Sequence, residues 1–182
     1  MESTKVITGK VRFSFVNVFS PKKNDDGSEG KYSVTLLVPK SDVKTCNAIK
    51  AAIEAARLGS ADKFGGKVPA NLKNTVHDGD GEKPNGGEYG PECKGCLVIN
   101  ASSSQKPGVV DRDKLEVLDP TDFYSGCYGR ASINFYAYNT SGNKGIACGL
   151  NNVQKLADGP ALGGGRARAE DDFDDDFDDD DI

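Results

Sequence analysis

The stretch GRASINFYAY, residues 129–138, decides the fold of this 182-residue chain. Its small and apolar residues fall on one side of an extended chain, and its polar and aromatic residues fall on the other. The first side consists of Ala131, Ile133, Phe135 and Ala137, and the second of Arg130, Ser132, Asn134, Tyr136 and Tyr138. This period of two predicts a β-strand with one face in a core and the other face outside it.

Other segments on both sides of this stretch also have strand character. They are residues 5–19, 31–38, 96–102 and 145–156, with a further short strand expected at 115–118. In the first segment, alternation places Val11, Phe13 and Phe15 on the core side and Lys10, Arg12 and Ser14 outside. In the second, Tyr32, Val34, Leu36 and Val38 are expected to point inward.

One helix interrupts the strands. Ser41 is expected to cap it, residues 41–57 carry an apolar face, and Gly59 ends it. Strands and helices do not alternate along the chain, which argues against a parallel α/β sheet. The sequence therefore predicts a mainly β fold, an OB-fold-like antiparallel barrel with one inserted α-helix and long loops, among them residues 60–92.

Charge divides the chain into a body and a tail. The whole chain has a net charge of −5, yet residues 170–182 hold Glu170, nine aspartates and no basic residue, a charge of −10, so the remainder carries +5. We expect a barrel domain at residues 1–157, a flexible Gly/Ala linker at 158–169 and a disordered acidic tail at 170–182.

The outer faces of the predicted strands combine cations with aromatic rings. Single-stranded nucleic acid needs both, cations for its phosphates and rings for its unpaired bases. The candidate nucleic-acid-binding residues are Lys10, Arg12, Lys31, Tyr89, Lys106, Arg112, Arg130, Tyr136 and Tyr138. The alternative is that the tyrosines cover a second small core and that the cations are ordinary solvated surface residues.

The acidic tail is the expected counterpart of this surface. Its charge resembles that of a polyphosphate, and its two rings resemble stacked bases. We therefore predict that the tail competes with nucleic acid for a basic groove on these outer faces and that it binds partner proteins. The residues assigned to this role are Asp171, Asp172, Phe173, Asp174, Asp175, Asp176, Phe177, Asp178, Asp179, Asp180 and Asp181. A merely solubilising tail is the alternative, although exposed phenylalanines add nothing to solubility.

Catalysis and metal binding have little support in the sequence. Asp78, Asp80, Asp111 and Asp113 are the acids that a two-metal nuclease would need, but their surroundings are typical of turns and no base or nucleophile accompanies them. Cys93 and Cys96 have metal-like spacing without a second pair. We expect no enzyme activity, no cofactor and no metal.

Several stretches resemble the phage and prophage single-stranded DNA-binding proteins that have an OB-fold core and an acidic C-terminal tail. These are YSVTLLVPKSD (32–42), HDGDGEK (77–83), INASSSQKPGVVDRD (99–113), SGCYGRASINFYAYN (125–139) and NKGIACGLNNVQKL (143–156). The resemblance implies sequence-independent binding of single-stranded DNA in phage replication, recombination or repair, and tail contacts with replication proteins. It makes a homodimer plausible. Unlike the tails of cellular relatives, this tail ends in Ile182 rather than in an aromatic residue.

The chain lacks an apolar run of the roughly 18 residues that would span a membrane, and its first residues lack a signal-peptide core. We therefore expect a cytoplasmic phage protein in the host cell. Two other functions stay open: a protein-interaction module or DNA mimic whose tail is the active surface, and the metal-dependent nuclease considered above.

Overall fold

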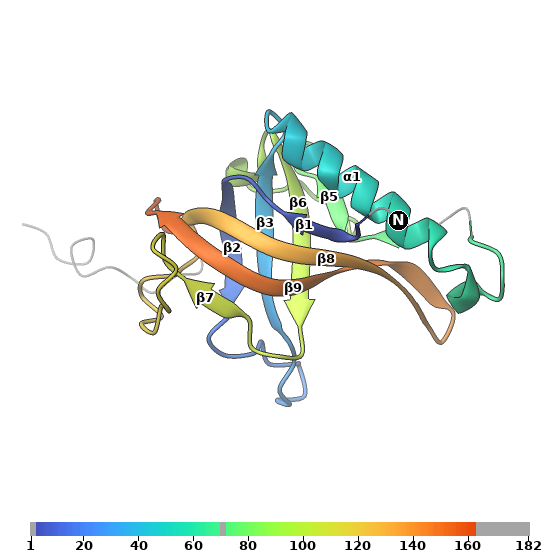
Figure 1. Cartoon of the computed structure of the whole chain (residues 1–182). Coiled ribbons are helices and arrows are strands. Elements are labelled where there is room, and N and C mark those ends of the chain that lie inside the picture. The colour runs from blue at the N-terminus through green and yellow to red at the C-terminus, as the bar shows by residue number, and fades with distance from the viewer. Residues whose placement is uncertain (1–2, 70–71, 163–182) are drawn as a thin grey trace, which may run out of the picture.

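The structure, a computed structural model, describes residues 3–69 and 72–162 (Figure 1). The predicted acidic tail, residues 170–182, and linker residues 163–169 lie outside the described residues.

The core of the fold is a closed ring of strands. The ring consists of β2 (Val11–Asn17), β3 (Tyr32–Pro39), β6 (Cys96–Ser103), β8 (Tyr128–Thr140) and β9 (Asn143–Ala157). They pair in the order β8, β2, β3, β6 and β9, and β9 returns to β8. Every pair is antiparallel except β6 with β9, which closes the ring in parallel. The predicted barrel of the OB type is confirmed.

Short strands extend the ring. They are β1 (Lys5–Ile7) on β8, β4 (Lys73–Asn74) and β7 (Gly108–Val110) on β9, and β5 (Val76–Asp78) on β6. The single strand predicted for residues 5–19 was wrong, because Thr8, Gly9 and Lys10 separate β1 from β2. The strand expected at 115–118 was also wrong, since only an isolated bridge joins Val110 to Glu116.

The inserted helix is α1 (Val43–Leu58), which packs against β1 and β8 across one end of the barrel (Figure 1). Its buried face includes Ile49, Ala52 and Ala56, as expected. The cap is Asp42 and not Ser41, because the Asp42 carboxylate accepts a hydrogen bond of 3.1 Å from the backbone N–H of Thr45. Two 3₁₀ turns, η1 (Ala61–Phe64) and η2 (Pro91–Cys93), lie within the long loop that follows.

The alternation of β8 is confirmed, since Ala131, Ile133, Phe135 and Ala137 are all buried. In β2 the expected inward side of Phe15 is wrong, because Phe15 is exposed, whereas Ser14, although buried, lies on the outer face as expected. The register between β2 and β3 shifts between Ser14 and Asn17, where β2 contains one residue more than β3. This β-bulge reverses the side on which the following residues point.

The outer face of β3 is covered as well. Leu37 is buried there in a second apolar cluster with Cys93 and Val98, and Tyr89 and Leu162 pack against its edge. The loop that ends at η2 and the chain after β9 therefore both cross the outside of the barrel near β3 and β6.

Candidate nucleic-acid interface

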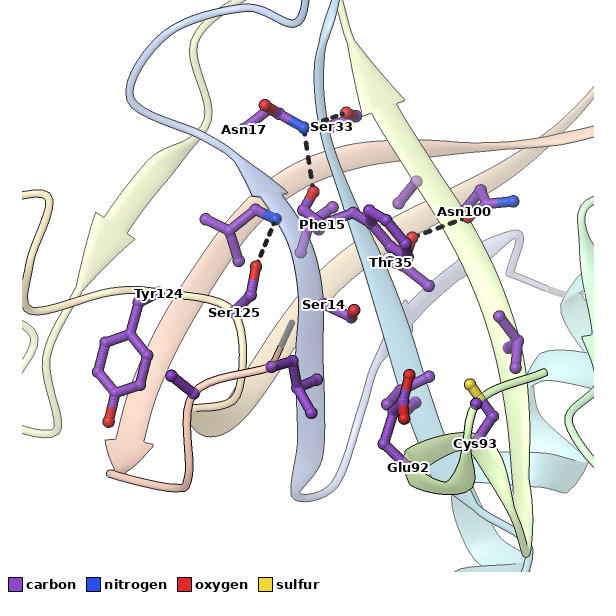
Figure 2. A pocket seen from close by; sticks show the side chains of 18 of the residues that line it. Ser14, Phe15, Asn17, Ser33, Thr35, Glu92, Cys93, Asn100, Tyr124 and Ser125 are labelled. Carbon is purple, nitrogen blue, oxygen red and sulfur yellow. Dashed lines mark hydrogen bonds between the residues drawn. The ribbon is translucent and has the colours of Figure 1, made fainter. Parts of the chain in front are cut away.

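A groove of about 1830 Å³ lies on the outer face of β2, β3 and β6 (Figure 2). Residues between Lys83 and Cys93 form part of its wall. Pro120 to Ser125 and the chain from Asp158 to Leu162 form another part. The groove therefore follows the barrel strands and is bounded by loops, the arrangement with which OB folds bind oligonucleotides.

The lining of the groove combines apolar side chains with many uncharged polar ones, and its few charges nearly cancel. Its uncharged polar side chains are Ser14, Asn17, Ser33, Thr35, Asn100, Ser102, Thr121 and Ser125. Its charged residues are Lys22 and Lys83, with Glu92 and Asp158 of opposite sign. Hydroxyl and amide groups donate to phosphate and sugar oxygens as well as to bases, so this surface suits a strand of nucleic acid without fixing its sequence.

Phe15 is an exposed ring in this groove (Figure 2). Its side chain is 74% exposed, and its backbone φ of 47° lies in the left-handed region. A bulky residue in that region costs roughly 1–3 kcal/mol and persists only where the surroundings hold it. Two hydrogen bonds of 3.1 Å do so: the Val16 N–H donates to Ser125 Oγ, and Asn17 Nδ2 donates to the Phe15 carbonyl.

Sequence reasoning had assigned Phe15 to the core and so missed it as a binding residue. A signal for the bulge was nevertheless present in VRFSFVNV. Apolar residues fall at odd positions up to Phe15 and at even positions from Val16 to Val18. Such a change of parity within one strand indicates an extra residue.

Of the predicted site residues, Tyr89 lines the groove. It is half-buried, its burial raises the pKa of its phenol, and Lys83 Nζ lies 5.9 Å from its ring centroid. Tyr124 also lines the groove and was not predicted.

Lys10 and Arg12 gather around a different ring. Their cationic groups lie 5.0 Å and 5.4 Å from the centroid of Tyr128. Arg12 also donates to the carbonyls of Gly126, at 3.1 Å, and Pro160, at 2.7 Å. Arg12 therefore contacts the backbone next to Ser125 and Ala161, which line the groove, without lining the groove itself.

The remaining predicted residues lie outside the groove lining. Arg130 donates to the carbonyl of Thr8 at 2.7 Å, and Arg112 donates to that of Leu156 at 3.2 Å. Tyr136 and Tyr138 line a separate hollow of about 450 Å³ beside Lys63. Lys31 and Lys106 are exposed, the first just before β3 and the second between β6 and β7. The structure thus distributes the predicted set over several surfaces.

The chain after β9 is held against the body. We call residues 158–162 the C-terminal strap. The Tyr124 hydroxyl donates to Asp158 Oδ1 at 2.8 Å, and the Leu162 N–H donates to the Ser125 carbonyl at 2.9 Å. Leu162 packs on the second apolar cluster. These contacts hold Leu162, the last residue that the structure describes, in the wall of the groove.

The acids considered for a nuclease have other contacts. Asp78 and Asp80 accept hydrogen bonds of 2.6 Å and 2.7 Å from Lys40 Nζ, which raise the pKa of Lys40 to about 12 and lower those of both carboxyls. Asp111 accepts from the N–H groups of Asp113 and Leu115, as in a turn. Within residues 3–69 and 72–162, no group of three His, Cys, Asp or Glu residues is placed to hold a metal ion.

Cys93 and Cys96, the pair with metal-like spacing, are free thiols at the second apolar cluster. Burial raises the pKa of both thiols, so both favour the protonated form.

Among the helices that the structure describes, none combines the length and the apolar character needed to cross a membrane.

Comparison with known proteins shows the family to which the chain belongs. The family model of the single-stranded DNA-binding protein of Enterobacter phage Enc34 matches residues 4–182, so the chain belongs to that family. Protein p50 of Acyrthosiphon pisum secondary endosymbiont phage 1 is 32% identical over 181 residues, which cover 93% of this chain and 92% of p50. The family is one of binding proteins and not of enzymes.

Two solved structures of the Enc34 protein are similar to this one. The structure in complex with single-stranded DNA has a TM-score of 0.74 and 30% identity, over 88% of this chain and 90% of that one. A C-terminal truncation has a TM-score of 0.73 and 28% identity, over 87% of this chain and 88% of that one.

Proposed function

We propose that this protein binds single-stranded DNA in the groove over β2, β3 and β6 without reading its sequence. The observation that carries the proposal is the exposed Phe15 ring in a groove lined by hydroxyl and amide groups. Every base has a face that can stack on such a ring, whereas a duplex keeps its bases stacked on one another. The solved complex of the Enc34 protein with single-stranded DNA supports this choice of ligand.

In this proposal the predicted cations supply the positive potential that attracts DNA to the protein. The residues concerned are Lys10, Arg12, Lys31, Lys106, Arg112 and Arg130, with Tyr89, Tyr136 and Tyr138 as further rings. Cations spread over the surface of the body attract a polyanion before it makes close contacts, and they contribute to the salt dependence of its binding. In the cell, the ligand is DNA exposed during phage replication, recombination or repair.

We further propose that the acidic tail competes with DNA for this groove and recruits replication or recombination proteins when DNA displaces it. The C-terminal strap supports this, because Leu162 lines the groove and residues 163–182 follow it directly. A flexible chain of that length reaches about 25 Å, and a tethered ligand has an effective concentration in the millimolar range. In this division residues 1–157 form the DNA-binding domain, 158–169 link it to the tail while their first residues border the groove, and 170–182 compete with DNA.

The test is a titration of fluorescently labelled oligo(dT) and of a matched duplex with the full chain and with a variant that lacks residues 170–182. We expect tighter oligo(dT) binding by the shortened protein, weak duplex binding by both, and intact DNA after incubation with Mg²⁺ or Mn²⁺. Equal oligo(dT) affinities of the full chain and the shortened protein would show that the tail does not compete with DNA. Absence of oligo(dT) binding by both proteins would instead favour the DNA mimic.

Partner recruitment needs its own measurement. Replication proteins of the phage or host should bind the full chain, and loss of residues 170–182 should abolish that binding while oligo(dT) binding persists. Sedimentation of the full chain with and without oligo(dT) would test the proposed homodimer. Fractionation of infected cells would test the proposed location in the host cytoplasm.

A further inference from the structure

We propose that Phe15 is the principal base-stacking residue of the groove and that the β2 bulge serves to hold its ring there. This inference rests on the proposed function and adds to it the residue on which a base lies. It starts from two local features that are each unfavourable for folding. A large ring is left 74% exposed, and its residue has a φ of 47°.

The surroundings of Phe15 fix that conformation. The bulge leaves backbone groups without ladder partners, and side chains of the groove satisfy them. Ser125 Oγ accepts from the Val16 N–H, and Asn17 Nδ2 donates to the Phe15 carbonyl (Figure 2). Without the extra residue, Phe15 would follow Phe13 into the core, as alternation alone predicts. The bulge therefore directs the ring outward, into the groove.

The other rings of the groove are less available. Tyr89 is half-buried against the second apolar cluster. Tyr124 is also half-buried, and its hydroxyl donates to Asp158. Phe15 has no hydroxyl to satisfy, and most of its surface is open to the groove. When a base stacks on the exposed Phe15 ring, the apolar faces of both are removed from water. DNA binding therefore buries a ring that folding leaves exposed.

The first test compares three substitutions at this position in the full chain. Phe15→Ala should weaken oligo(dT) binding about 5- to 150-fold, the range that corresponds to one base stack. Phe15→Gly should weaken it similarly while leaving the melting temperature unchanged or higher, because glycine adopts positive φ without strain. Phe15→Trp should keep the affinity within a few-fold. The matched control is Leu58→Ala, which removes another exposed apolar side chain, at the end of α1, and should change nothing.

The second test measures stacking itself. The chain contains no tryptophan, so Phe15→Trp creates a single reporter whose fluorescence should be quenched by oligo(dT). An abasic oligonucleotide of equal length should quench it little. That ligand should also bind the natural protein more weakly than oligo(dT) does, with a smaller further loss in Phe15→Ala.

The outcomes separate the two proposals. If the natural protein binds oligo(dT) and Phe15→Ala binds it equally well, the role of Phe15 is refuted and the proposed function stands. If the natural protein does not bind oligo(dT) at all, the proposed function itself fails. A change of oligomeric state in Phe15→Ala, with unchanged affinity for DNA, would assign the ring to a protein contact and also refute stacking.

Discussion

Thr8 shows how one hydroxyl connects the segment between β1 and β2 to the neighbouring strand β8. The residue has no exposed surface, and its Oγ1 accepts a hydrogen bond of 2.9 Å from the Ala131 N–H while donating one of 2.8 Å to the Gly9 carbonyl. The Thr8 carbonyl accepts the Arg130 guanidinium. Arg130 therefore has a structural contact as well as the DNA role predicted for it.

Replacing Thr8 with valine should lower the free energy of unfolding by about 1–3 kcal/mol. The substitution keeps the shape of the side chain but leaves the buried Ala131 N–H without its acceptor. Thr8→Ser, which keeps the hydroxyl, is the matched control and should lose less. Urea unfolding of the three proteins measures the effect, and equal losses in both variants would show that the methyl group rather than the hydroxyl matters.

At the scale of elements, β8 depends on a glycine at its start. Gly129 pairs with Val11 of β2 on one side and with Lys155 of β9 on the other. A Cβ atom there would collide with the Gln154 carbonyl oxygen and lie 2.9 Å from Cε2 of Phe13. The first residue of the stretch GRASINFYAY is thus a glycine because two neighbouring strands approach its backbone closely.

Gly129→Ala should therefore destabilise the barrel by about 1–3 kcal/mol, since strand backbones must move apart to accept one methyl group. Gly81→Ala is the control, because a Cβ atom at that exposed position would lie 3.4 Å from its nearest neighbour, the Asp78 carbonyl oxygen. Thermal unfolding followed by circular dichroism distinguishes them. A Gly129→Ala protein as stable as the control would show that β8 and β9 yield easily at this point.

The sequence predicted those elements whose signals are local. Strict alternation in β8 identified its core face, and the apolar face of residues 41–57 identified α1. The outer cover of β3 could not be predicted in this way, because Leu37 meets Cys93 and Leu162, which are distant in sequence. The groove was missed for the same reason: its lining comes from β2, β3, β6 and two loops, and among the predicted binding residues only Tyr89 lies in it.

At the scale of the whole molecule, charge is the property that relates the body to the tail. The proposed competition opposes a body of +5 and a tail of −10, while the groove lining itself holds Lys22 and Lys83 against Glu92 and Asp158. Attraction of the tail to the body is therefore long-ranged and spread over many charges. Stacking and hydrogen bonding in the groove are short-ranged and respond less to salt.

This difference predicts how the effect of the tail changes with salt. The ratio of oligo(dT) affinities, shortened protein to full chain, should be greatest near 50 mM salt and should approach one as salt rises towards 1 M. The Debye length shrinks from roughly 14 Å to 3 Å over that range, which screens the tail from the body. Both affinities should also fall, because the counterions released on binding gain less entropy when the surrounding salt is more concentrated. Fluorescence titrations at a series of salt concentrations measure both trends.

Two tail variants separate charge from rings in the same experiment. Replacing both Phe173 and Phe177 with alanine keeps all nine aspartates, whereas replacing the nine aspartates with asparagine keeps both rings. If charge alone drives competition, the alanine variant should match the natural protein at every salt concentration, and the asparagine variant should match the shortened one. If the rings of Phe173 and Phe177 also stack in the groove, for example on Phe15, the alanine variant should bind DNA more tightly than the natural protein. That gain in affinity should persist at high salt. A ratio that does not change with salt would contradict electrostatic competition altogether.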